Sequence, residues 1–260
     1  MSSIKDNFCL VVPHYEQYKS LKEFLPKLLD LGLTVIMVDD GSREKTKIRL
    51  RERIRYLEKK YSNECHLIEH DDNKGKGAAI YTGSRVARNF GFSHMIQIDA
   101  DGQHDVNDVP AFIEQSEQYP DQIISGAPTF DDSAPKARVY GRKVTDFWVA
   151  LETMSLSIRD SLCGFRVYPL SQFQEAHDRF TIGPRMDFDT DIMVKSVWLG
   201  IPIRFVETKV IYTDKSASHF HYVRDNLRLI WLHTRLMCGM LIRLPQLASL
   251  RLSGQKASSN

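Results

Sequence analysis

The chain has 260 residues, 42% of them hydrophobic, which is enough to bury one sizeable core but few for two full domains. Its 35 basic and 33 acidic residues leave a formal charge of +2, which excludes a strong overall attraction to nucleic acid. The four cysteines are scattered without a C-x-x-C pair, so they indicate neither a zinc site nor a disulfide framework.

The amino terminus and the apolar segments bear on the cellular compartment. Residues 1–8, MSSIKDNF, lack the basic region, apolar core and cleavage site of a secretory signal, so we expect a cytoplasmic protein. Arginine and histidine residues between 228 and 243 interrupt the longest apolar region, which does not reach the roughly 18 uninterrupted residues of a membrane span. A peripheral position on the inner face of the cell membrane is compatible with this pattern.

Five short apolar runs alternate with helical patterns in the first half of the chain. They occupy residues 8–12, 34–38, 66–70, 94–98 and 122–126. Because several are almost continuously apolar, they indicate strands that are covered on both faces. The sequence therefore predicts an α/β protein with a doubly wound, mostly parallel sheet flanked by helices.

The most informative polar segment is DADGQH (99–104), directly after the apolar run at 94–98. Residues two apart in an extended chain face the same side, so Asp99 and Asp101 can bring their carboxylates together at the end of the strand. Oxygen ligands of this kind suit Mg²⁺ or Mn²⁺ shared with phosphate oxygens. Alternatively, Asp101 and Gly102 form a turn and Asp99 caps the next helix.

A second acidic pair, Asp39 and Asp40, ends the run at 34–38, where open α/β sheets bind ligands. These carboxylates can accept hydrogen bonds from a nucleobase or a ribose, although Asp-Gly-Ser is also ordinary turn and helix-cap chemistry. The segment NKGKGAA (73–79) opens a helix whose start can receive a phosphate or ribose. It matches neither G-x-G-x-x-G nor the P-loop, which disfavours a dehydrogenase or an NTPase.

The segments VVPHYEQ, VDDGS, NKGKGAA and DADGQH occur in this order, and with them the sequence resembles the family 2 glycosyltransferases. With the later segment DSLCGFR (160–166), it is similar in particular to the polyprenyl-phosphate hexosyltransferase branch. The resemblance covers about residues 8–212 and implies the Rossmann-like GT-A fold. It also implies inverting, metal-dependent transfer of a hexose from a nucleotide diphosphate sugar, UDP-sugar before GDP-sugar, to a lipid-linked or other acceptor.

Individual residues receive roles from the motifs and from this resemblance. Residues expected to bind the donor are Pro13, Tyr15, Glu16, Asp39, Asp40, Lys76, Asp99 and Arg166. Residues expected around Mn²⁺ or Mg²⁺ are Asp99, Asp101, Gln103 and His219. Arg166 can pair with a diphosphate but can equally pack beside its aromatic neighbours. His219 belongs to a pair of histidines, 219 and 221, which beside aromatic residues is more often structural.

A third acidic segment, MDFDTDIMVKSVWLG (186–200), matches a family segment that carries an acidic residue, and the match assigns this role to Asp191. As a general base, Asp191 would take the proton of an acceptor hydroxyl that attacks the anomeric carbon. A lipid phosphate is already ionised, and Asp191 would then serve orientation or charge balance. Asp187, Asp189 and Asp191 also suit a helix start, where the helix dipole favours negative charge.

We expect a nucleotide-sugar-binding domain at residues 1–215 and an amphipathic helical tail at 216–260 that ends in a disordered segment. The tail interleaves large apolar residues with arginine, which suits an anionic membrane interface. A helix docked on its own domain, or a dimer contact, explains this pattern nearly as well. The tail is similar to that of bacterial glycosyltransferases of lipid or aryl-polyene pathways.

Two other functions are compatible with such a sheet. A sugar-nucleotide nucleotidyltransferase needs a basic glycine-rich loop after its first strand, and VVPHYEQ (11–17) has none. A non-catalytic, membrane-associated protein that binds nucleotide sugars would keep the fold, but the presence of Asp99, Asp101 and Asp191 favours an enzyme. The expected partners are therefore a nucleotide-sugar donor and a lipid-linked acceptor, with no nucleic acid.

Overall fold

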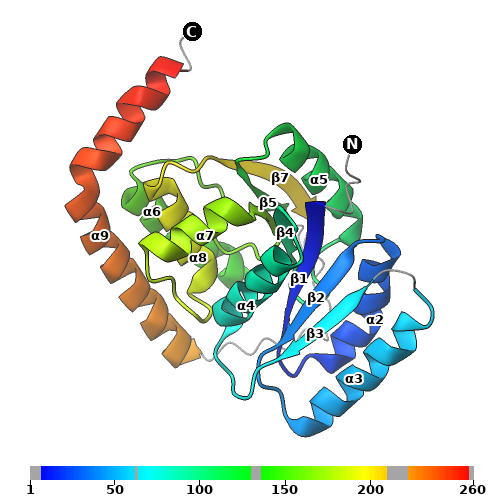
Figure 1. Ribbon diagram of the computed structural model, residues 1–260. Coiled ribbons are helices and arrows are strands. Elements are labelled where there is room, and N and C mark those ends of the chain that lie inside the picture. The colour runs from blue at the N-terminus through cyan, green and yellow to red at the C-terminus, as the bar shows by residue number, and fades with distance from the viewer. Residues whose placement is uncertain (1–6, 62–63, 130–135, 210–221, 258–260) are drawn as a thin grey trace.

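The computed structural model describes residues 7–61, 64–129, 136–209 and 222–257. His219, His221 and the expected domain boundary at 215/216 lie outside these residues. Seven strands of the described chain form one sheet in the order β3-β2-β1-β4-β6-β5-β7 (Figure 1). They are β1 (Phe8–His14), β2 (Thr34–Asp39), β3 (Cys65–Glu69), β4 (His94–Gln97), β5 (Ile123–Thr129), β6 (Arg166–Pro169) and β7 (Ile203–Lys209).

All five predicted strands are present, and the mostly parallel sheet is confirmed. The sequence runs did not indicate β6 and β7. Strand β6 is antiparallel to both β4 and β5, and Arg166 at its start lies opposite Gln97 at the end of β4. Because of this reversed direction, the GFR segment meets the DADGQH segment at one edge of the sheet.

Helices cover both faces of the sheet, and each face has its own cluster of buried apolar side chains. Alternation along β1 divides them, since Leu10 faces one cluster and Val11 the other. One face carries α2 (Tyr18–Asp30), α3 (Glu44–Glu58), the short helix η1 (Val106–Asp108) and α5 (Val109–Gln118). The other carries α4 (Lys76–Asn89), α7 (Leu170–Arg179) and α8 (Phe188–Trp198), with α6 (Lys136–Thr153) and α9 (Tyr222–Ala257) packed outside them.

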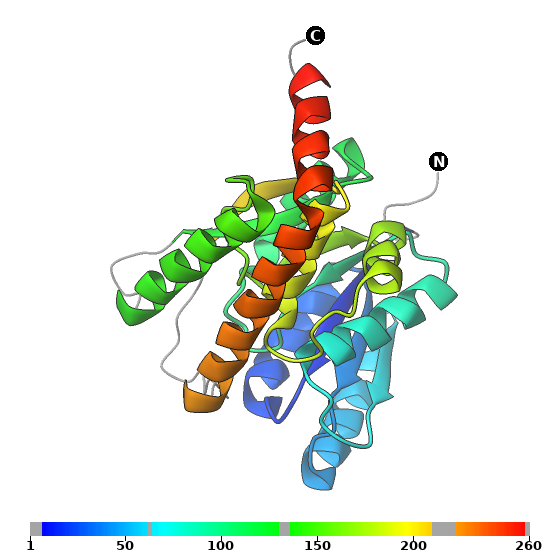
Figure 2. The same cartoon turned by 90° about the vertical axis from the view of Figure 1, so that its left-hand side faces the viewer.

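Helix α9 is docked on its own domain along its middle and projects beyond the domain at its C-terminal end (Figures 1 and 2). Its buried side chains recur at helical spacing and are Leu232, Leu236, Met240 and Leu247. The helix reaches Ala257. None of the helices in the described ranges has the length and apolar character needed to cross a membrane.

Close packing and buried polar contacts fix this docking. A Cβ at Gly239 would lie 2.6 Å from the Trp198 ring, so only glycine permits the observed approach of α9 to α8. The Trp198 indole donates to the Glu152 carbonyl at 2.9 Å, and the Glu152 carboxylate pairs with His233 of α9 at 2.7 Å. Apolar burial and polar contacts therefore act together on the same helix.

We predict that Leu236→Ala lowers the free energy of unfolding by about 2–5 kcal/mol, because it leaves a cavity under α9. Leu241, on the same helix, is 57% exposed, whereas Leu236 is 1% exposed. Leu241→Ala is therefore the matched control and should change the free energy by less than about 0.5 kcal/mol. Urea denaturation followed by circular dichroism measures both. Equal effects of the two substitutions would contradict the docked position of α9.

Candidate active site

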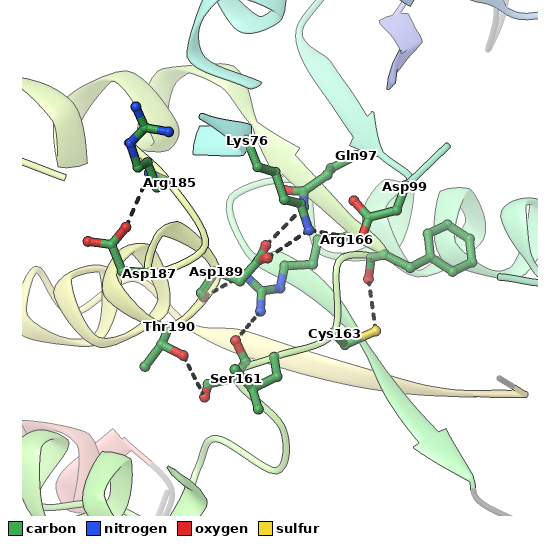
Figure 3. Close-up of polar contacts among 12 residues, drawn as sticks. Lys76, Gln97, Asp99, Ser161, Cys163, Arg166, Arg185, Asp187, Asp189 and Thr190 are labelled. Carbon is green, nitrogen blue, oxygen red and sulfur yellow. Dashed lines mark hydrogen bonds and ion pairs between the residues drawn. The ribbon is translucent and has the colours of Figure 1, made fainter. Parts of the chain in front are cut away.

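At the carboxyl edge of the sheet, the Lys76 ammonium lies between two carboxylates (Figure 3). Lys76 is the first residue of α4, Asp99 follows β4, and Asp189 lies in the first turn of α8. The Lys76 Nζ is 2.8 Å from Asp99 Oδ2 and 2.7 Å from Asp189 Oδ2. Three segments far apart in sequence thus share one ion cluster at the predicted site.

Neighbouring groups fix the cluster in place. The Gln97 amide donates to Asp189 Oδ1 at 3.0 Å, so both carboxylate oxygens of Asp189 have a partner. Gly164 closes one side, because a Cβ there would lie 2.3 Å from Asp99 Oδ2 and 2.7 Å from Lys76 Nζ. Burial opposes ionisation of Asp189, but the nearby Lys76 and Arg166 cations outweigh it and hold the pKa of Asp189 below its usual value.

The structure surrounds Arg166 with protein groups and does not expose it to a diphosphate. Its side chain is fully buried, and its guanidinium donates to the carbonyls of Ser161 at 2.7 Å and Asp189 at 2.8 Å and to the Tyr168 hydroxyl at 3.0 Å. Figure 3 shows it behind Asp189, directed towards Ser161. Arg166 therefore joins β6, α8 and the 160–164 loop, which is the packed alternative to diphosphate binding.

Asp39 and Asp40 are also engaged within the protein. Asp39 pairs with the His14 ring at 2.7 Å and accepts from the Ser42 amide at 3.0 Å. Asp40 accepts from the amides of Lys74 at 2.9 Å and Gly75 at 2.7 Å. The bonds of Asp39 and Asp40 thus stabilise the turn at the end of β2 and hold the NKGKGAA loop against the sheet.

The remaining expected donor residues lie in the loop after β1. Pro13 is buried, whereas the Tyr15 ring is 38% exposed. Glu16 has a positive φ of 55° and accepts from the Arg43 amide at 2.6 Å, which ties this loop to the start of α3. Of these three residues, Tyr15 is the exposed one.

The start of α4 is covered by the loop between α7 and α8. The Ala78 amide donates to the Pro184 carbonyl at 3.0 Å, so this amide is not open to a phosphate. A Cβ at Gly77 would lie 2.6 Å from the Gly183 carbonyl oxygen. The glycines of NKGKGAA therefore permit close packing here, and Lys76 is the group of this segment that reaches the cluster.

Asp191 has surroundings different from those expected of a base. Its side chain is fully buried, lies 2.5 Å from the Lys195 ammonium and accepts from the Gly183 amide at 2.7 Å. Asp189, two residues earlier, points to the opposite side of α8 and enters the site instead. The repeated D-x-D pattern does not distinguish these two residues in the sequence, and Asp189 was not among the expected site residues.

The residues after β4 fit a divalent cation. Asp99 Oδ1 is buried without a hydrogen-bond partner among the described residues, which leaves a carboxylate oxygen for a ligand. Burial raises the pKa of Asp99 to about 6. The Lys76 ammonium opposes this rise, and the nearby carboxylates of Asp189 and Asp101 add to it. Asp101 Oδ1 accepts from the Gln103 amide at 3.0 Å. The described residues contain no group of three His, Cys, Asp or Glu placed for a metal. Oxygen atoms of a bound ligand would therefore have to complete the coordination shell of the metal.

Comparison with known proteins places the chain in a family. Residues 9–180 match the family model described as glycosyl transferase family 2, and the chain belongs to this family. The resemblance drawn from the sequence motifs is therefore confirmed.

Two relatives and one solved structure illustrate the similarity. The dolichyl-phosphate beta-glucosyltransferase of Dictyostelium discoideum is 27% identical over 77% of this chain, which spans 61% of that relative. The UDP-N-acetylglucosamine–dolichyl-phosphate N-acetylglucosaminyltransferase of Methanococcus voltae is 23% identical, with 90% of this chain and 97% of the relative covered. The glucosyl-3-phosphoglycerate synthase of Mycobacterium tuberculosis, solved with Mn²⁺ and UDP, has a TM-score of 0.63 at 15% identity, with 91% of this chain and 78% of that chain covered. The expected GT-A fold is confirmed.

We predict that Asp40→Ala speeds hydrogen exchange at the amides of Lys74 and Gly75 and lowers the free energy of unfolding by about 1–3 kcal/mol, since it leaves buried donors unpaired. Asp71→Ala, at an exposed position of the same loop, is the control. Exchange followed by mass spectrometry or NMR measures the first effect and urea denaturation the second. Unchanged exchange in Asp40→Ala would contradict the fastening role of this carboxylate.

Proposed function

We propose that this protein transfers a hexose from a nucleotide diphosphate sugar, UDP-sugar before GDP-sugar, to a polyprenyl phosphate at a membrane surface, with inversion at the anomeric carbon. The observation that carries the proposal is the position of α6, which connects the acidic cluster with an exposed apolar surface. Membership in family 2 and the acceptors in the names of the two relatives support the same activity.

The donor side of the proposal rests on the residues after β4. Asp99 and Asp101 would hold Mn²⁺ or Mg²⁺, which when bound neutralises charge on the departing nucleoside diphosphate. Lys76 lies beside Asp99 and brings a second positive charge to the same edge. Tyr15 is exposed at the end of β1, where it can contact the nucleoside. Mn²⁺ and UDP in the Mycobacterium tuberculosis structure agree with this assignment.

The acceptor side rests on α6. Arg142 forms an ion pair with Asp160, whose Oδ1 accepts from the Cys163 amide at 2.7 Å, next to Gly164 and the cluster. The same helix presents an exposed stripe at helical spacing, namely Tyr140, Val144, Phe147, Trp148 and Leu151. An isoprenoid chain can lie along such a stripe while its phosphate reaches the edge of the sheet.

Helix α9 adds a second exposed apolar face beside the first. Helices α6 and α9 pack together and lie side by side on the face of the molecule seen in Figure 2. The large apolar residues of α9 that the structure describes as exposed are Leu227, Ile230, Trp231, Leu241, Ile242, Leu244 and Leu250. Tryptophan and tyrosine favour the interface between lipid and water. We call these two sets of exposed residues on α6 and α9 the apolar surface.

The surroundings of Asp191 favour a phosphate over a hydroxyl acceptor. A hydroxyl nucleophile needs a base within reach, whereas Asp191 is fully buried beside Lys195. A phosphate monoester carries about −1.5 to −2 charge at pH 7 and attacks without losing a proton to the protein. Asp191 then contributes charge balance and orientation of α8, the second of the two roles expected for it.

The proposed function predicts a labelled product that extracts with lipid when the protein is incubated with radiolabelled UDP-glucose, undecaprenyl phosphate and Mn²⁺. Asp101→Asn should lower the rate roughly 10²-fold or more, because a Lewis-acid metal supplies several kcal/mol. Asp30→Asn, at the exposed end of α2, is the control. GDP-mannose replaces UDP-glucose in a parallel series. Label found only in water-soluble product, or no transfer from either donor, would reject the lipid-phosphate acceptor or the transferase, respectively.

The membrane part of the proposal predicts that the protein co-sediments with vesicles containing phosphatidylglycerol. The double substitution Phe147→Asp/Trp231→Asp should weaken binding at least about tenfold, since one buried aromatic side chain contributes about 1.5–3 kcal/mol. Tyr56→Asp, at a residue 61% exposed on α3, is the control and should bind as the wild type does. Unchanged binding of the double variant would reject the apolar surface as the membrane contact.

A further inference from the structure

We propose that Asp189 is a further positioning residue of this site. Asp189 holds Lys76 as an internal counter-cation. Asp99 can exchange this ammonium for a divalent metal, and Lys76 then binds the donor diphosphate. The proposal rests on the proposed donor site and adds to it a coupling between the binding of metal and the binding of nucleotide. The donor-binding and metal-binding residues expected from the sequence do not include Asp189.

The cluster requires a cation because its carboxylates are poorly solvated. The side chains of Asp99 and Asp189 are 25% and 5% exposed, and that of Lys76 is 13% exposed. A buried carboxylate without a positive partner is strongly unfavourable. In the protein alone, Lys76 supplies the positive charge that a metal ion would supply to Asp99.

The two carboxylates differ in their freedom to exchange this partner. Asp189 has Gln97 on one oxygen and Lys76 on the other, and its main-chain carbonyl accepts from Arg166 at 2.8 Å. Asp99 has Lys76 on one oxygen, while the other has no partner among the described residues. Asp99 is therefore the member that can turn to a metal, and Asp189 is the member that keeps Lys76 in place.

Two of the three donors of the Lys76 ammonium bond to Asp99 and Asp189, so the donor that loses Asp99 needs another acceptor. A phosphate oxygen of the donor can take it, because the diphosphate carries the charge that Asp99 withdraws. Metal alone removes a partner from Lys76 and offers none in return, whereas metal with diphosphate replaces it. Binding of metal and nucleotide is thus positively coupled, and by linkage the coupling acts equally in both directions.

The experiment measures Mn²⁺ binding by electron paramagnetic resonance, with and without UDP, in the wild type and in Lys76→Met. Without UDP, Lys76→Met should bind Mn²⁺ at least about tenfold more tightly, because two carboxylates have lost their competing cation. The factor by which UDP tightens Mn²⁺ binding should be smaller than in the wild type, because the part of the coupling that acts through Lys76 is lost while direct contact between metal and diphosphate remains. Lys74→Met, at an exposed residue of the same loop, removes the same charge and should behave as the wild type does.

Lys76→Met removes the ammonium that two carboxylates share, which can disturb folding. The double variant Lys76→Met/Asp189→Asn removes one positive and one negative charge, so it keeps the net charge of the cluster and controls for this effect. It should bind Mn²⁺ alone more tightly than the wild type and less tightly than Lys76→Met, with the same loss of coupling. Mn²⁺ affinity in the absence of UDP that is unchanged in both variants would overturn the counter-cation role. Tighter Mn²⁺ binding by the variants together with no UDP binding by the wild type would support that role while rejecting the nucleotide site.

Discussion

The balance of charge at one poorly solvated edge of the sheet constrains much of this protein. Asp99 and Asp189 are neutralised by Lys76 and Arg166, and each of these four residues comes from a different segment. Because isolated buried charges are costly, α4, β6, α8 and the loop after β4 must all be in place together. The local features follow from this requirement, including glycine at 164, where any side chain would enter the Lys76–Asp99 pair.

Acidic residues on two opposite sides of α8 connect this edge of the sheet with the outer helix α9. Asp187 and Asp191 are four apart and share one side, where Asp187 lies 3.7 Å from Arg235 of α9 and Asp191 pairs with Lys195. Asp189 lies between them in sequence and faces the opposite side, towards Lys76. One short acidic segment therefore serves both the site and the docking of α9, which in turn supports the apolar surface beside α6.

Several of these features could be predicted from the sequence. Four of the five apolar runs predicted the parallel strands β1 to β4, whereas the parallel partner of β5, strand β7, was not predicted. The position of DADGQH after one of the runs predicted the edge where Lys76 and Asp99 meet. Strand β6 could not be predicted, because its four residues of mixed polarity show no clear period. The reversed direction of this strand, which buries Arg166, could not be predicted either. The sequence did not show which of Asp189 and Asp191 faces the site. The two residues lie on opposite sides of α8, but only the packing of this helix on the sheet determines which side faces the site. The spacing of Tyr140, Val144 and Phe147 was a readable signal of the stripe on α6.

The reversed direction of β6 also bears on how such proteins diverge. Strand β5 ends and β6 begins at the same edge of the sheet, so the chain leaves and re-enters the fold beside the reaction centre. The segment between Thr129 and Arg166, which includes α6, begins and ends at two adjacent hydrogen-bonded strands. The part that carries α6 can change in length or sequence without changing the register of the strands that carry Asp39 and Gln97. Ser161 and Gly164, at the end of the same segment, are bound to this register, because they contact Arg166 and the Lys76–Asp99 pair.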